Sequence, residues 1–413
     1  MMKKWISSII FLSLLINIYA CSSNPSDLPT AIVTRNGAIP FPTQKTSTNN
    51  IINAQSSFLT DLPENANDIT RDFLVVFEKN GGLWISTPND VLQLTSDGHD
   101  KRPKLSKDGS LVVFQRGLEL WVLEISTRQE RKIFSEIDFA PLQFEFSPSN
   151  HSIYFTTESV DGKPRYDLNK GDGDKGGSRI LLDPGRGGEF TPDSSWKTVI
   201  LVQPGLMMTF QIEGSDTQIV YKYLIDLGSS GSYLPKITWL ENGYGFNSVI
   251  PVAGSSIMRF MFIGKDGGMS AQIAEFSADQ TKIDNIKISP DGSSVLYLQE
   301  KGNNLEIHVI DASTTDRVIS KLERGRIGIV GWAPNSKNII YWLEEPQNVW
   351  ISSISVNSIL SDTGSAEYIK WVNSGTFLFL GQSELRIMSL GHESRSLVSD
   401  ITGDYDWILL KKK

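Results

Sequence analysis

The chain has 413 residues, a formal charge of −8 from 47 acidic and 39 basic residues, and one cysteine. A single thiol excludes an intrachain disulfide framework and a zinc site built from cysteines. The acidic balance argues against a nucleic-acid partner, because proteins that bind nucleic acid usually present a basic face. The 39% hydrophobic content suffices for a core, so a wholly disordered chain is excluded as well.

Residues 1–20 are typical of a secretory signal. Lys3 and Lys4 form a positive start, and an apolar run follows from Trp5 to Ile18. That run holds about 14 residues, which is too short to span a hydrocarbon core of about 30 Å comfortably. We therefore predict a signal peptide that directs the chain out of the cytoplasm.

The segment Ile18-Tyr19-Ala20-Cys21 resembles the lipobox of bacterial lipoproteins, although Tyr19 is bulkier than the usual residue at its position. The resemblance implies cleavage between Ala20 and Cys21, a diacylglycerol on the Cys21 sulfur and acylation of the new amine. Two or three acyl chains hold a protein firmly where one holds it only marginally. We expect a lipid anchor on the extracytoplasmic face of the cell membrane, or facing the periplasm if a second membrane exists. An ordinary signal peptide or an uncleaved anchor is the alternative.

Residues 21–67 are rich in Ser, Asn, Thr and Pro, as in the stretch Gln-Lys-Thr-Ser-Thr-Asn-Asn at 44–50. Such a composition cannot bury enough apolar area to offset the entropy of ordering it. We predict a disordered tether that lifts the rest of the chain, residues 68–413, off the membrane. Packing of residues 51–59 onto that domain is the alternative.

One pattern recurs after residue 70: a turn of the Ser-Pro-Asp-Gly type, a short β-branched and aromatic run, and a second strand that often carries Trp. Proline presets φ at the second turn position, and glycine tolerates the last one. Copies begin at residues 106, 147, 191, 238, 289, 333 and 372, and a first copy before Phe73 has lost the turn. Short strands repeated about every 44 residues are typical of propeller blades.

Eight copies over residues 70–413 give about 43 residues per blade, which predicts an all-β, eight-bladed propeller of four-stranded antiparallel blades. Seven blades of about 49 residues are the alternative. The first copy begins at its second strand, and the segment 405–410 resembles an innermost strand. We therefore expect the C-terminal strand to complete the first blade and leave no open sheet edge.

The tryptophans support the repeat. Seven of the nine outside the signal fall in two repeated registers, which indicates blade packing rather than a ligand-stacking stripe. The seven are Trp84, Trp121, Trp239, Trp332, Trp350, Trp371 and Trp407.

Gln93-Leu94-Thr95, the Ser-Pro-Asp-Gly turns and Leu120-Trp121-Val122 resemble the WD40-like repeat of TolB-type periplasmic proteins. The same repeat forms the propellers of dipeptidyl-peptidase and prolyl-oligopeptidase enzymes. The likeness covers about residues 70–413 and implies an architecture rather than a function, because propellers serve many tasks. The peptidases add an α/β-hydrolase domain with a Gly-x-Ser-x-Gly elbow. This chain lacks that motif, because Gly228-Ser229-Ser230-Gly231 has the wrong spacing.

Metal and catalytic motifs are also absent from the sequence. No histidine lies within four residues of another, so His99, His151, His308 and His392 are interpreted as solvated or packed side chains. The segment 167–177 combines Asp and Gly as calcium loops do, but its register fails. We interpret it as a polar hairpin of the third blade.

Paired acids need separate attention, because glycan-cleaving enzymes use two carboxylates. Glu344-Glu345 and the pair Asp404 and Asp406 are candidates only by proximity. Carboxylates of different blades can also converge in the central channel, and three or more there would favour an enzyme.

The sequence predicts no catalytic residue, metal or cofactor. We expect a monomeric, non-enzymatic propeller that binds or scaffolds a protein, peptide or glycan partner and is joined to a membrane through Cys21. A glycan-active hydrolase with carboxylates in the channel is one alternative. A TolB-like structural component of an envelope complex is another.

Overall fold

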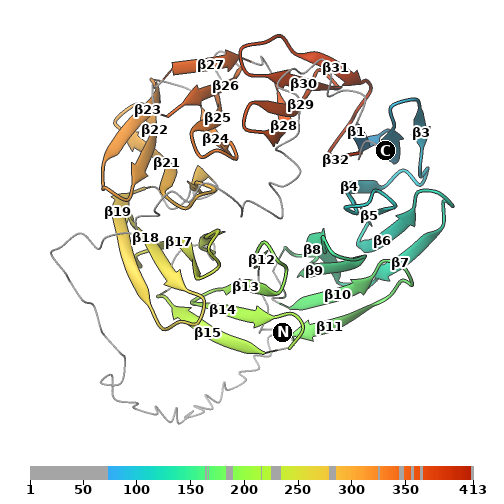
Figure 1. Cartoon of the computed structure of the whole chain (residues 1–413), viewed down its shortest axis with the longest axis horizontal. Helices are drawn as coiled ribbons and strands as arrows, with labels where there is room; N and C mark the ends of the chain where they lie inside the picture. Colours follow the sequence, from blue (N-terminus) through green and yellow to red (C-terminus); the bar gives the residue numbers. More distant parts are fainter. Residues whose placement is uncertain are drawn as a thin grey trace, which may run out of the picture. The chain divides into compact units, whose positions relative to one another are not determined.

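The structure, a computed structural model, describes residues 73–410 apart from 163–164, 166, 183–188, 215, 225–233, 279–284, 324–325, 344–347, 355–357 and 363–365. The predicted signal at 1–20 and tether at 21–67, with Ala20 and Cys21, lie outside this part. The described residues form eight four-stranded sheets arranged in a ring (Figure 1). The eight-bladed propeller is confirmed, and the seven-bladed alternative is wrong. No described helix is long and apolar enough to cross a membrane.

Each blade is written from its innermost strand outward. Blades 1 to 4 are β32 (Tyr405–Leu409), β1 (Phe73–Lys79), β2 (Gly82–Ser86), β3 (Val91–Gln93); β4 (Asp100–Leu105), β5 (Leu111–Arg116), β6 (Glu119–Glu124), β7 (Glu130–Phe134); β8 (Phe139–Phe146), β9 (Ser152–Ser159), β10 (Leu168–Asp172), β11 (Ser178–Leu182); β12 (Glu189–Pro192), β13 (Thr198–Gln203), β14 (Leu206–Gln211), β15 (Thr217–Lys222).

Blades 5 to 8 follow the same order along the chain. They are β16 (Lys236–Trp239), β17 (Gly245–Pro251), β18 (Ile257–Gly264), β19 (Ser270–Ser277); β20 (Lys287–Ile288), β21 (Ser294–Lys301), β22 (Asn304–Asp311), β23 (Asp316–Leu322); β24 (Ile327–Trp332), β25 (Asn338–Leu343), β26 (Asn348–Ser353), β27 (Ser358–Asp362); β28 (Glu367–Asn373), β29 (Thr376–Gly381), β30 (Glu384–Ser389), β31 (Arg395–Val398).

The second strand of each blade carries much of the core. In the first three blades its aromatic residue is fully buried, as Phe77, Phe114 and Phe155 are all 0% exposed. These strands have continuous apolar runs because both faces of each blade pack against a neighbouring blade. The core is thus distributed between neighbouring blades.

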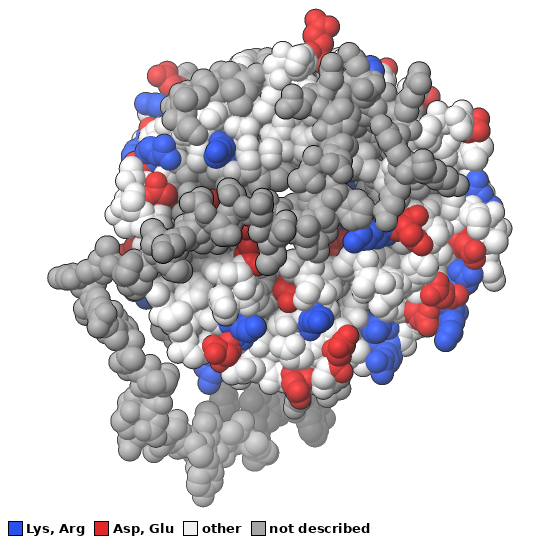
Figure 2. Space-filling view, in the orientation of Figure 1, with Lys and Arg blue, Asp and Glu red and all other residues white. Residues whose placement is uncertain are grey.

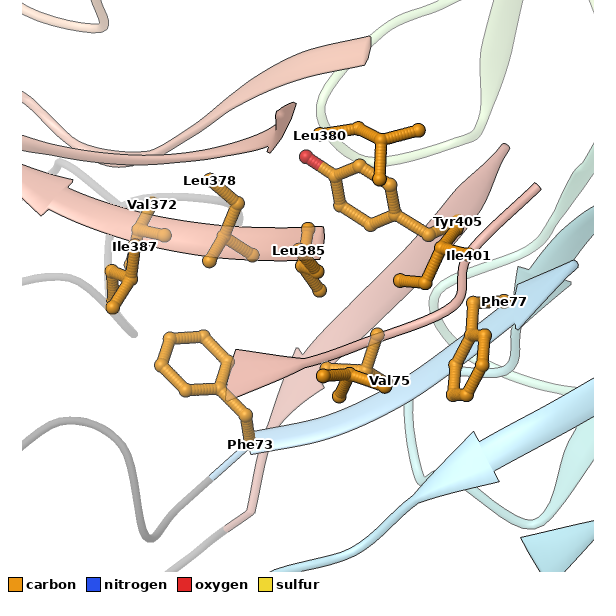
Figure 3. Close-up of a cluster of buried hydrophobic side chains, with 11 residues drawn as sticks. Phe73, Val75, Phe77, Val372, Leu378, Leu380, Leu385, Ile387, Ile401 and Tyr405 are labelled. Carbon is orange, nitrogen blue, oxygen red and sulfur yellow. The ribbon is translucent and has the colours of Figure 1, made fainter. Parts of the chain in front are cut away.

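The ring closes where the sequence predicts. The strand β32 pairs with β1, so that Val75 lies opposite Trp407 and Phe73 opposite Leu409. Phe73, Val75 and Tyr405 pack in one cluster with residues of blade 8 (Figure 3). The Tyr405 hydroxyl also donates a hydrogen bond of 2.7 Å to the carbonyl of Tyr368 in blade 8.

Candidate binding site in the central channel

The innermost strands surround the axis of the ring (Figure 1), and their polar side chains are the first place to look for a site. Seven charged side chains gather on one side, from β28, β32 and the residue before it, β1, β4 and β8. We call this set the axial charge cluster; it consists of Glu78, Arg102, Lys104, Glu145, Lys370, Asp404 and Asp406.

Two ion pairs in the cluster join neighbouring blades. Lys104 Nζ lies 3.5 Å from Glu145 Oε1, which joins blades 2 and 3. Lys370 Nζ lies 2.9 Å from Asp404 Oδ1, which joins blades 8 and 1, and it also donates to the Tyr405 carbonyl. The side chains of Lys370 and Asp404 are 28% and 24% exposed, so water reaches both partners.

Backbone contacts extend the cluster over blades 1 to 3. The Asp406 carboxylate accepts a hydrogen bond of 2.8 Å from the backbone N–H of Leu105. The Arg102 N–H donates to Glu78 Oε1 at 2.7 Å, while its guanidinium donates to the carbonyls of Pro141 and Leu142 at 3.0 and 2.6 Å. Arg102 has a φ of +55° at an irregularity in β4, which shows that the strand bends to place it.

The protonation of the cluster is set by burial and by its own charges. Burial raises the pKa of Asp406 and of Glu145 above the usual range for carboxyl groups, and the nearby Lys104 only partly opposes this. Burial alone would lower the pKa of Lys104, but Glu145, Asp406 and Asp404 raise it overall. Burial likewise raises the pKa of Glu78. The three carboxyl groups and Lys104 therefore hold protons more tightly than in open water, whereas burial lowers the pKa of Arg102.

The opposite wall of the channel contains a cavity of about 350 Å³ between β12, β16, β20 and β24. Two tryptophans hold its walls together: Trp239 Nε1 donates to the Thr191 carbonyl at 2.9 Å, and Trp332 Nε1 donates to the Lys287 carbonyl at 2.9 Å. These contacts agree with the interpretation that the repeated tryptophans organise blade packing. The cavity residues are Glu189, Thr191, Val202, Pro235, Lys236, Ile237, Thr238, Ile286, Lys287, Ile288, Pro290, Gly331 and Trp332.

A Ser-His-Asp arrangement also occurs between the turns that follow β4 and β8. His151 Nδ1 lies 2.6 Å from Asp174 and its Nε2 lies 3.3 Å from the Ser110 hydroxyl. However, Nε2 also lies 3.1 Å from Asp108, to which Ser110 donates. Burial would lower the pKa of His151, but the two carboxylates raise it. The ring thus links Asp108 and Ser110 of blade 2 to Asp174 of blade 3, and the raised pKa favours its protonated form, which is the poorer base.

His308 is 1% exposed and also lies between two carboxylates. Its ring nitrogens lie 3.2 Å from Glu306 and 3.0 Å from Asp316, and the ring stacks on Tyr297. The prediction of a packed side chain is correct here, and the exposed His99 and His392 are solvated as predicted. What the sequence analysis missed is the carboxylate pairing of His151 and His308, because those partners are set by blade geometry.

The other predicted candidates have different outcomes. Asp404 and Asp406 belong to the axial charge cluster. The segment 167–177 leads from β10 toward β11 in blade 3, which confirms the predicted hairpin. Glu344-Glu345 and the stretch 228–231 lie outside the described residues. In the described part of the chain, no group of three or more His, Cys, Asp and Glu side chains could hold a metal ion.

Comparisons with known proteins give only partial or distant matches. No family model matches the chain. It is 31% identical over 101 residues to a protein described as a putative Tricorn-like protease C-terminal subunit, from Sulfurisphaera tokodaii. That match covers 24% of this chain and 11% of the relative, so the chain spans about a tenth of the relative's length.

The solved structures that match this chain do so with TM-scores below 0.5 and low sequence identity. A eukaryotic initiation factor matches with a TM-score of 0.48 and 9% identity, over 81% of this chain and 98% of its own. An oligogalacturonate lyase in complex with manganese has a TM-score of 0.46 and 13% identity, over 65% and 81%. TolB from Acinetobacter baumannii has a TM-score of 0.35 and 16% identity, over 63% and 65%. The blade assignment rests on the strand pairing of this chain itself.

Proposed function

We propose that this protein is a lipoprotein held to the extracytoplasmic face of a membrane through Cys21, and that its propeller binds a protein, peptide or glycan partner at the axial charge cluster without catalysis. The observation that carries the proposal is the cluster itself. Its side chains come from four blades and are fixed by ion pairs and backbone hydrogen bonds. A site that is already ordered loses less entropy when a ligand binds.

Ion pairing leaves the cluster able to bind. A lysine ammonium has three donors, and a carboxylate has about four acceptor positions, so one contact does not exhaust either group. The side chains of Lys104 and Glu145 are 30% and 43% exposed, which leaves room for a partner's polar groups. Donors and acceptors side by side suit the amides of a peptide or the hydroxyls of a glycan.

A glycan-active hydrolase is the second candidate. Four carboxylates gather in the cluster, which meets the criterion of three or more that favours an enzyme, and the raised pKa of Asp406 and Glu145 suits a general acid. Three cations lie among them, and Lys104 contacts Glu145 directly. Inverting and retaining hydrolases need one protonated acid and one free carboxylate on either side of the scissile bond. We favour binding because the cluster pairs its acids with cations and with a backbone N–H.

The binding test uses the full chain in its own membrane and compares Lys370→Gln with Lys265→Gln. Lys265 is an exposed lysine between β18 and β19, so its variant is a matched control for the loss of one positive charge. Cross-linking followed by mass spectrometry should recover partners with the wild type and the control but not with Lys370→Gln. Thermal denaturation checks that all three proteins fold.

Two results would count against the proposal. Equal recovery of partners by Lys370→Gln and Lys265→Gln would remove the cluster from binding. Cleavage of a glycan by the wild type and its loss in Asp406→Asn would replace binding with catalysis. The anchor is tested separately: the mass of the membrane-bound protein should include a diacylglyceryl group that Cys21→Ser lacks.

A further inference from the structure

Two exposed aromatic side chains lie on neighbouring blades beside the axial charge cluster. Trp342 is the last residue but one of β25 and is 38% exposed. Tyr368 is the second residue of β28 and is 46% exposed. A single exposed aromatic residue is ordinary, but two on adjoining blades next to a set of charges form a patch that a partner can use.

Both aromatic residues lie at the rim of the ring where the innermost strands begin. Trp342 pairs with Gly328, the second residue of β24, and Tyr368 is the second residue of β28. Asp404 immediately precedes β32 in the next blade. Each of these strands is the first of its blade along the path of the chain, so their first residues mark one rim across blades 7, 8 and 1 (Figure 1).

Gly328 allows the indole of Trp342 to pack on the innermost strand. A Cβ atom at Gly328 would collide with Trp342 Nε1, so only glycine leaves room for the indole there. Alternation along β25 places Trp342 on the same face as Ile340, which packs with Ile369 of blade 8. The indole therefore lies on the side of blade 7 that faces blade 8, where Tyr368 precedes Ile369.

The backbone of Tyr368 is strained. Its φ of +48° lies in the left-handed region, at an irregularity of β28 between Glu367 and Lys370. The Tyr405 hydroxyl helps to hold this conformation, because it donates a hydrogen bond of 2.7 Å to the Tyr368 carbonyl. Strain of this kind is typically kept where the position of a side chain serves a function.

The charges around Tyr368 are negative. Partial burial raises the pKa of its hydroxyl most, and the carboxylates of Glu78, Asp404 and Glu367 raise it further. Acidic and basic side chains are interspersed on the face shown in Figure 2, so an acidic surrounding such as this one is a local feature of the molecule. The formal charge of −8 on the whole chain adds a long-range attraction for cations.

The cluster already holds one of its own cations between a ring and an acid. Lys370 Nζ lies 4.4 Å from the centre of the Tyr405 ring and 2.9 Å from Asp404 Oδ1. Among the residues that the structure describes, no cation lies over the ring of Trp342 or of Tyr368. The same combination of aromatic faces and carboxylates therefore recurs at this rim with the rings still exposed.

We propose that Trp342 and Tyr368 receive a positively charged side chain, an arginine or a lysine, from a partner peptide or protein. The faces of the two rings attract the cation, and the neighbouring carboxylates add to that attraction. Aromatic faces also stack on sugars, but the negative surroundings of Tyr368 favour a cation over an uncharged glycan. The inference rests on the proposed function, because it names the kind of partner and the group that the site takes.

NMR titration of the full chain tests this site with tripeptides whose ends are blocked, so that only the central side chain can carry a charge. The probes are acetyl-Gly-Arg-Gly-amide, the same peptide with lysine, and the same peptide with citrulline, which replaces the guanidinium by an uncharged urea. We expect the arginine or the lysine peptide to bind about fivefold more tightly than the citrulline peptide. The tighter of the two charged peptides identifies the cation as a guanidinium or an ammonium.

Variants then assign the binding to the two rings. Tyr368→Leu and Trp342→Leu should each weaken binding of the charged peptide about two- to fivefold, whereas Tyr368→Phe keeps the ring and should bind as the wild type does. Tyr244→Leu is the matched control, because Tyr244 is 73% exposed between β16 and β17. Glu367→Gln should also weaken binding, and Glu241→Gln, at another exposed glutamate of that turn, should not.

Three results would overturn the inference. One is equal binding of the charged and citrulline peptides, and another is equal binding by Tyr368→Leu and Tyr244→Leu. The third is tighter binding of cellobiose, an uncharged glycan probe, together with its loss in Trp342→Leu. Lys370→Gln removes a positive charge and should not weaken the charged peptide, so this test is separate from the partner recovery that tests the proposed function. Melting temperatures close to that of the wild type confirm that each variant folds.

Discussion

Closure of the ring predicts an energetic coupling between residues 334 positions apart in the chain, Phe73 and Trp407. Their rings meet edge to face, with centroids 5.3 Å apart and planes at 69°. Phe73 is 4% exposed, so the contact is largely shielded from water. An aromatic pair of this kind contributes about 0.5–1.5 kcal/mol beyond the area that it buries.

The measurement is a double-mutant cycle with Phe73→Leu, Trp407→Leu and the double variant, followed by urea denaturation. Leucine retains most of the apolar burial, so the variants should still fold, while the ring-to-ring contact is lost. We expect the double variant to be about 1 kcal/mol more stable than the sum of the single losses predicts.

A second cycle supplies the control. Phe276 is 7% exposed in blade 5 and belongs to a different core cluster from Phe73. Sites that share no partner add within about 0.3–0.5 kcal/mol, so Phe73→Leu and Phe276→Leu should be additive. If the Phe73 and Trp407 cycle is as additive as this control, the C-terminal strand does not close the first blade in solution.

Three further predictions follow from single groups. The pKa of His151 is raised in the fold, so the protonated ring stabilises the protein fully below its unfolded pKa of about 6.5. This stabilisation is lost as the pH rises through the folded pKa, and the free energy of unfolding between pH 5 and 9 should fall in the wild type but not in His151→Gln. The pKa of Asp406 is also raised, so the fold disfavours its charged form. Asp406→Asn should therefore be more stable than the wild type at pH 7 and equally stable at pH 3. A variant less stable than the wild type at pH 7 would contradict this. Gly292 and Gly243 both have a positive φ in equivalent turns, but only at Gly292 would a Cβ meet Asn247 Nδ2, at 2.8 Å. Gly243→Ala should lower the free energy of unfolding by about 1 kcal/mol, and Gly292→Ala should lower it clearly more. Equal losses in urea or thermal unfolding would refute the steric argument.

Much of the fold is predictable because each blade repeats the same local chemistry. A Ser-Pro-Asp-Gly turn is held by hydrogen bonds between its own residues. The Ser289 hydroxyl accepts one from the N–H of Ser294 at 2.9 Å, and the Gly292 N–H donates one to the Ser289 carbonyl at 2.8 Å. Such turns depend on about six neighbouring residues, so the sequence displays them directly. The missing innermost strand of the first copy likewise led to the correct partner for β32.

The candidate site is less predictable, because its residues come one or two from each blade. Successive side chains of a strand point to opposite sides, which normally indicates the ones that face the axis. Two irregularities change this order, one between Lys101 and Lys104 in β4 and one between Pro141 and Gln143 in β8. The sequence analysis therefore found Asp404 and Asp406 by proximity alone. It had no signal for Lys104 or for the cavity, because blades that are equivalent in pattern place different side chains at the axis.

The two ends of β1 give the ring a direction that bears on the proposed function. Phe73, where the described chain begins, lies opposite Leu409 at one end. Toward the other end of this seven-residue strand, the N–H of Glu78 donates to the carbonyl of Asp404 at 3.1 Å. A strand of this length spans about 20 Å, so the Asp404–Lys370 pair and the point where the chain enters the propeller lie at opposite ends of blade 1. A partner that approaches the axial charge cluster from the Asp404 end therefore meets the end of blade 1 that lies away from Phe73.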